Sequence, residues 1–209
     1  RYLLTTGLDG TASLWSFHTG KLQATLEANS LIPLWAAFSP DSQRLLTVGF
    51  DRLARVFAIP DGRLLAVLRG HSDAVNSAAF APDSRTIVTA SFDHSARVWS
   101  AERGQHLQVF VGNTDTVDKA VYSPDGLQVA TAGRDRTVRV FDARTARELM
   151  RLVHPSAVMH ITFSPDGRQL ATSLIHGGDV WVWDWRTGRG ELLVGYQRDD
   201  FRLSRLAFS

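Results

Sequence analysis

The 209-residue chain has no cysteine and only two lysines, Lys21 and Lys119. The lack of cysteine excludes disulfides, thiolate metal sites and thiol nucleophiles. The sequence also lacks an apolar run of 18 residues and a basic segment followed by an apolar one, so it predicts neither a membrane span nor a signal peptide. We therefore expect a cytoplasmic location, although the sequence starts at Arg1 and a targeting segment can lie outside it.

Charge of one sign is not concentrated anywhere in the sequence. The 23 basic and 21 acidic residues leave a formal net charge of +2, and no run of five like charges occurs. Nucleic-acid-binding proteins usually gather Lys and Arg on one face, so we expect no nucleic-acid partner. The 44% of apolar residues is enough to form a substantial hydrophobic core.

An internal repeat of 42 residues dominates the sequence. Aromatic residues keep this interval at Trp15, Phe57, Trp99, Phe141 and Trp183. Aspartates keep it at Asp9, Asp51, Asp93 and Asp135. A fixed period of about 40 to 45 residues indicates an architecture in which similar units stack on one another.

Each repeat unit predicts four short antiparallel strands. In the unit from 75 to 110, strands are predicted at 75–80, 86–91, 95–100 and 105–110, with turn signals such as Ala81-Pro82-Asp83-Ser84 between them. Apolar residues lie on both faces of these strands, so each sheet needs a neighbour on each side. Radial stacking of sheets meets this need for every unit at once, which predicts an all-β β-propeller.

We predict one propeller domain over residues 1–209, with about five blades, four complete and one divided between the two ends. The predicted blades cover about 1–26, 32–68, 74–110, 116–152 and 157–194, and another first strand starts at 202–209. Two interpretations remain open. The last strand closes a five-bladed ring, or the chain is a piece of a larger propeller that other domains of the same chain or a second copy complete.

Five short stretches resemble the signature of one family. They are Gly70-His71, Ser91-Phe-Asp93, Arg97-Val-Trp99, Ser164-Pro-Asp-Gly167 and Val182-Trp183-Asp184. They resemble the WD-repeat (tryptophan-aspartate repeat) β-propeller family. The resemblance implies a structural tetrad inside a blade, formed here by His71, Ser91, Asp93 and Trp99. It also implies a non-catalytic scaffold or sensor domain that binds a protein or peptide, within a larger multidomain signalling protein.

A serine, a histidine and an aspartate within 23 positions also suggest a hydrolase triad. Ser91, however, ends a predicted strand and has no Gly-x-Ser-x-Gly elbow around it. The alternative function is a propeller enzyme, a hydrolase with a metal in the central channel. His154, His160 and His176 lack the short spacing of a zinc site, so we predict no metal, no cofactor and no enzyme activity.

The resemblance places partner contacts on the loops of one propeller face. The residues at these positions vary from blade to blade while the framework around them repeats. The predicted partner-binding residues are Leu8, Ile32, Leu34, Phe50, Asn76, Phe92, Asp118, Arg134, Met159 and His176. His176 lies in a loop, 174–179, that departs from the regular repeat, and such loops often carry function.

Overall fold

A computed structural model describes residues 1–7, 9–27, 33–175, 178–194 and 206–208. This part of the chain contains strands β1 to β19 and no helix, so the all-β prediction is confirmed. No helix among the described residues is long and apolar enough to cross a membrane.

The strands form five antiparallel sheets in chain order, which we number as blades one to five. Blade one contains β1 (Tyr2–Thr6), β2 (Thr11–Ser16) and β3 (Leu22–Glu27). Blade two contains β4 (Pro33–Phe38), β5 (Arg44–Gly49), β6 (Ala54–Ala58) and β7 (Leu64–Leu68). Blade three contains β8 (Val75–Phe80), β9 (Thr86–Ser91), β10 (Ala96–Ser100) and β11 (His106–Phe110).

The last two described blades repeat the same plan. Blade four contains β12 (Val117–Tyr122), β13 (Gln128–Gly133), β14 (Thr137–Asp142) and β15 (Glu148–Val153). Blade five contains β16 (Val158–Phe163), β17 (Gln169–Leu174), β18 (Val180–Asp184) and β19 (Arg189–Val194). In blade three the predicted strands 75–80 and 86–91 have the observed bounds, and the other two begin one residue later than predicted.

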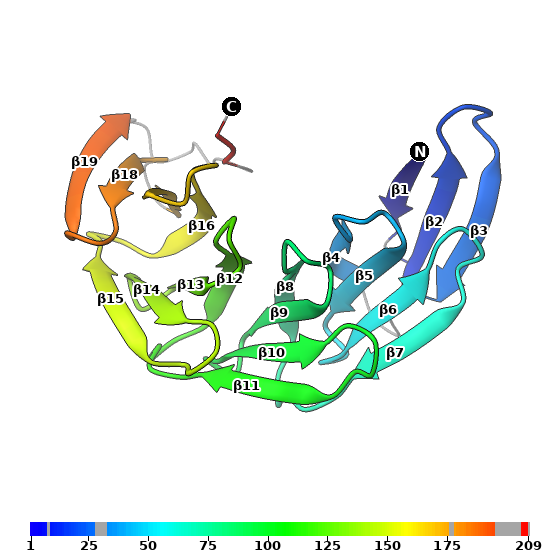
Figure 1. Cartoon of the computed structure of the whole chain (residues 1–209), viewed down its shortest axis with the longest axis horizontal. Helices are drawn as coiled ribbons and strands as arrows, with labels where there is room; N and C mark the ends of the chain where they lie inside the picture. Colours follow the sequence, from blue (N-terminus) through cyan, green and yellow to red (C-terminus); the bar gives the residue numbers. More distant parts are fainter. Residues whose placement is uncertain (8, 28–32, 176–177, 195–205, 209) are drawn as a thin grey trace.

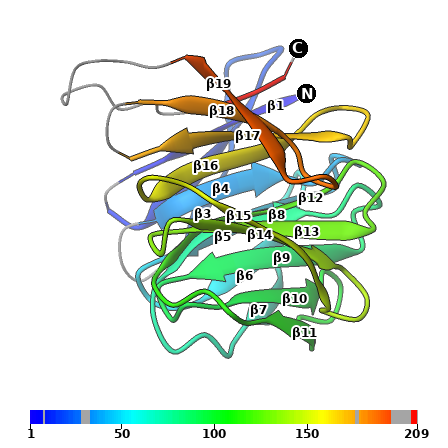
Figure 2. The ribbon, with the colours of Figure 1, turned by 90° about the vertical axis from the view of Figure 1, so that its left-hand side faces the viewer.

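The five blades stand side by side in an open arc (Figure 1). Strands β4, β8, β12 and β16 line the inside of the arc, and β7, β11, β15 and β19 lie on its outside. The side view shows most strands lying roughly along one common axis, with the two ends of the arc overlapping in this direction (Figure 2). In the described part of the chain, β1 pairs only with β2. Of the strand predicted at 202–209, only residues 206–208 are described, and they are not in a strand.

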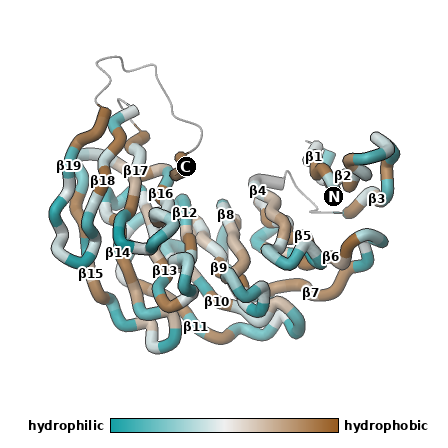
Figure 3. Tube along the Cα trace, turned by 45° about the horizontal axis from the view of Figure 1, so that its top comes forward, coloured by the Kyte–Doolittle hydropathy of each residue, from teal (hydrophilic) through white to brown (hydrophobic). Residues whose placement is uncertain are grey.

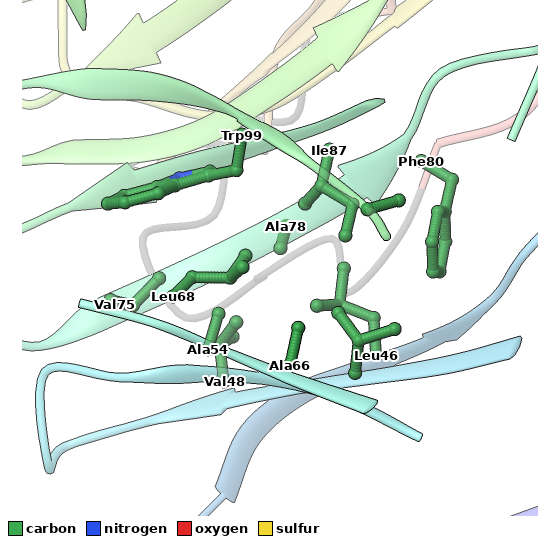
Figure 4. Close-up of a cluster of buried hydrophobic side chains, with 12 residues drawn as sticks. Leu46, Val48, Ala54, Ala66, Leu68, Val75, Ala78, Phe80, Ile87 and Trp99 are labelled. Carbon is green, nitrogen blue, oxygen red and sulfur yellow. The ribbon is translucent and has the colours of Figure 1, made fainter. Parts of the chain in front are cut away.

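The hydrophobic core lies between neighbouring blades. Between blades two and three, Leu46 of β5 and Leu68 of β7 pack against Ile87 and Trp99 of blade three (Figure 4). Val56 of β6 belongs to the same buried cluster. Burying one such side chain stabilises the fold by about 1.5–3 kcal/mol. Hydrophilic residues gather at the turns that join the strands (Figure 3). Most of the buried apolar contacts are therefore made by the strands, whereas the turns are exposed to solvent.

Candidate functional site

A buried polar network joins two strands of blade three, the turn between them and the loop before β8. His71 Nδ1 lies 2.8 Å from Asp93 Oδ2, and His71 Nε2 lies 2.7 Å from Thr89 Oγ1. The indole N–H of Trp99 donates to the same Thr89 oxygen at 2.8 Å. A neutral His71 with its proton on Nδ1 satisfies all of these contacts, because it then donates to Asp93 and accepts from the Thr89 hydroxyl. We call these four residues the third-blade network.

Ser91 is not part of this network, so its assignment to the tetrad was wrong. Its hydroxyl donates to the backbone oxygens of Ala74 and Asp73 at 2.8 and 3.1 Å and accepts the N–H of Asp93. The rings of His71 and Trp99 reach the middle of β9, where Thr89 lies, and not its end, where Ser91 lies. Ser91 is also fully buried, which removes the water access that a hydrolase nucleophile needs.

A threonine occupies the position of Thr89 in every blade. The series is Thr5, Thr47, Thr89, Thr131 and Thr172, at intervals of 42, 42, 42 and 41 residues. In three further blades the hydroxyl bonds the same kinds of partner: Trp15 donates to Thr5, Thr131 donates to Asn113, and Thr172 contacts both His154 and Trp183. This periodic threonine was visible in the sequence and was the signal that our sequence analysis missed.

Two ionisable groups of these buried networks, Asp93 in blade three and His154 in blade five, have pKa values that are both lowered, for different reasons. Burial raises the pKa of Asp93, but hydrogen bonds from His71, Ser95 and the N–H of Ser72 outweigh it and lower the pKa overall. His154 takes the place of His71 in blade five, and its Nε2 contacts Thr172 at 3.0 Å. Its Nδ1 has no hydrogen-bond partner among the described residues. Burial lowers the pKa of His154 to about 4, so this ring is neutral at pH 7.

Three of the predicted partner-binding residues meet on adjacent blades. Phe50, Phe92 and Arg134 each follow the second strand of their blade. The rings of Phe50 and Phe92 lie edge to face, with centroids 6.3 Å apart, and the Arg134 guanidinium lies 5.7 Å from the Phe92 centroid. Phe50 is 43% exposed, Arg134 is exposed and Phe92 is partly exposed. We call these three residues the rim cluster.

Two more predicted contact residues support the rim cluster from below. Asn76 Nδ2 donates to the backbone oxygen and to Oδ1 of Asp118, at 3.1 and 3.0 Å. Arg134 Nε donates to Asp118 Oδ2 at 3.3 Å. Burial raises the pKa of Asp118, and the charge of Arg134 opposes this rise. Asp118 is buried, so its carboxylate positions Arg134 and is not itself presented at the surface.

The remaining predicted contact residues lie elsewhere. Met159 is half-buried in β16 and lines a cavity together with Asn76 and Asp118. Leu34 lies in β4, and its side chain is outside the described part of the structure. Leu8, Ile32 and His176 lie outside the described residues.

A comparison with protein families agrees with this geometry. The family model described as WD domain, G-beta repeat (WD40) matches residues 62–100, 104–142 and 147–184, which make up more than half of the chain. The chain belongs to the WD40 family. The resemblance inferred from the sequence is therefore confirmed. A comparison of this WD40 chain with curated proteins finds no match.

WD40 repeats are generally protein-interaction scaffolds, and WD40 domains are typically not enzymes. Within the described part of this WD40 chain, no three His, Asp or Glu side chains are grouped so that they could hold a metal ion. The third-blade network itself ties the loop before β8 to β9, β10 and the turn between them.

Proposed function

We propose that this WD40 protein is a non-catalytic interaction scaffold that binds a protein or peptide through the rim cluster, as part of a larger multidomain protein. The carrying observation is the edge-to-face contact of Phe50 and Phe92 with Arg134 beside it, on the loops of three adjacent blades. Aromatic residues and arginine are enriched among the residues that contribute most binding energy in protein interfaces.

The rim cluster has the physical properties of a binding site. Phe50 exposes much of an apolar ring, and removing apolar surface from water favours association with a partner. The guanidinium of Arg134 can add hydrogen bonds to a partner's backbone or carboxylate oxygens. One apolar and one polar anchor side by side give a partner both affinity and orientation.

The surrounding structure holds these side chains in place. Phe92 lies between Ser91 and Asp93, which hydrogen bonds fix to the Ala74 carbonyl and to His71. Arg134 is held by Asp118. Side chains that are ordered before binding lose less conformational entropy when a partner arrives. The stiff blades therefore favour tight recognition by a small set of residues.

A double variant, Phe50→Asp with Phe92→Asp, tests this function. Two carboxylates in the rim cluster disfavour an apolar partner surface without opening the core, because both residues lie at the surface. We expect affinity capture from the native source to lose specific partners with this variant, while the denaturation midpoint stays close to that of the wild type.

Phe17→Asp is the matched control. Phe17 is 67% exposed and follows β2. It lies beside the start of β1, the second strand of the repeat unit, whereas the rim cluster residues follow the ends of such strands. The control should retain the partners that the wild-type protein captures. Equal capture by all three proteins would contradict the proposed function.

A further inference from the structure

A small cavity on the inside of the arc lies next to the rim cluster. Its lining includes the third residue of each inner strand, namely Trp35, Ser77, Lys119 and His160. Asn76 and Asp118 also line it. Asp118 bonds Arg134 of the rim cluster, so the cavity and the proposed binding surface share one set of side chains.

The charges around the cavity favour a negative group. The carboxylate of Asp118 already accepts hydrogen bonds from Arg134 and Asn76, so its charge is compensated. The ammonium of Lys119 lies 3.3 Å from the centroid of the Trp35 ring. This contact fixes the position of the cation, and an ammonium group in this position attracts a carboxylate that enters the cavity.

Ser77 provides a second, independent indication of a ligand. Its side chain is buried, with 2% exposed, and lines the cavity. Its hydroxyl makes no hydrogen bond within the described part of the chain. Buried polar groups in folded proteins nearly always have a hydrogen-bond partner, so this hydroxyl is an available donor in the wall of the cavity. A carboxylate oxygen would accept its proton.

We propose that this cavity binds one acidic side chain, Asp or Glu, of the partner peptide. The carboxylate would accept hydrogen bonds from Lys119 and Ser77 while the flanking residues of the peptide cover Phe50 and Phe92. The cavity volume is about 160 Å3. It therefore holds a side chain and is smaller than the usual site of a drug-sized ligand.

The two lysines of the chain make a direct test practical. Lys119 lines the cavity, and Lys21 is exposed on blade one, so Lys21 is an internal control for amine acetylation. The protein is treated with limiting acetic anhydride in the presence of one of two pools of degenerate nonapeptides. The pools differ only in the fixed central residue, Glu or Gln. Mass spectrometry then gives the acetylation rate of each lysine.

This inference rests on the proposed function. The results of the acetylation experiment distinguish a failure of the cavity proposal from a failure of the proposed binding surface. We expect the Glu pool to slow acetylation of Lys119 several-fold relative to the Gln pool, with no change at Lys21, and we expect Ser77→Ala to reduce this protection. Equal Lys119 rates with the two pools would overturn the acidic-residue proposal, while loss of capture by the Phe50 and Phe92 variant would still support the binding surface. Equal protection by free glutarate would assign the cavity to a small carboxylic acid and overturn the peptide assignment.

Discussion

The indole N–H of Trp99 donates to the hydroxyl oxygen of Thr89 at 2.8 Å, so the repeated aromatic of β10 is tied to the repeated threonine of β9. His71 contacts the same oxygen from the loop before β8. One hydroxyl therefore fixes the position of two buried rings, and its removal affects both.

Replacing Thr89 by valine should destabilise the protein more than replacing Ser91 by alanine. Valine keeps the volume of Thr89 but leaves ring nitrogens of both His71 and Trp99 without a partner, at a cost of about 1–3 kcal/mol for each unpaired buried group. Thr89→Ser retains the hydroxyl and is the matched control. Urea denaturation measures the free energies of unfolding. A Thr89→Val protein as stable as the wild type would contradict the role assigned to this threonine.

The stability of the protein should decrease in mildly acidic solution because of His154. Burial lowers its pKa to about 4 in the folded state, whereas an unfolded histidine has a pKa of about 6.5. The unfolded state therefore binds more protons between these values, so stability is lost as the pH falls through this range. The expected loss from this residue between pH 7 and pH 5 is about 2 kcal/mol.

His154→Asn isolates this contribution. Blade four carries Asn113 in the equivalent place, and asparagine does not titrate. Between pH 7 and pH 5 the wild type should lose about 2 kcal/mol more unfolding free energy than the His154→Asn variant. An unchanged difference would show that His154 does not titrate as its burial requires.

Removing Arg134 should raise the pKa of Asp118 further. Burial already raises this pKa, and the charge and hydrogen bond of Arg134 are what limit the rise. Carboxyl carbon NMR, assigned with Asp118→Asn, should show the titration of Asp118 at higher pH in Arg134→Met. Arg168→Met, which changes an exposed arginine of another turn, should leave the titration unchanged. The same Asp118 titration midpoint in the wild type, Arg134→Met and Arg168→Met would mean that Asp118 does not hold Arg134 in solution.

The repeat made the fold predictable, because one interval fixed the strands, the turns and the buried aromatics together. It did not identify the partner of Trp99. Thr89 and Ser91 lie on the same strand two residues apart, so both side chains point to the same face. Only the positions of the His71 and Trp99 rings decide between them. The sequence analysis assigned the serine near the turn, whereas in the structure the bonds are made by Thr89 in the middle of the strand.

For the candidate binding surface, the sequence predicted individual residues but not most of the contacts between them. The repeat placed Phe50 and Phe92 at equivalent positions, which explains why they meet between adjacent blades. It did not show that Asp118 is buried beneath Arg134, because this contact joins different repeat positions. The cavity lined by Ser77 and Lys119 was also missed, since it appears only when four inner strands stand together.

The position of the periodic threonine has a consequence for how such a protein can change. In blade five, Thr172 still links His154 and Trp183, and within the described residues His154 Nδ1 has no partner like the one that Asp93 gives His71. A blade anchored at mid-strand does not depend on its exposed turn to stay together. The loops at the turn end of a blade can therefore change in sequence while the strands of the blade keep their register.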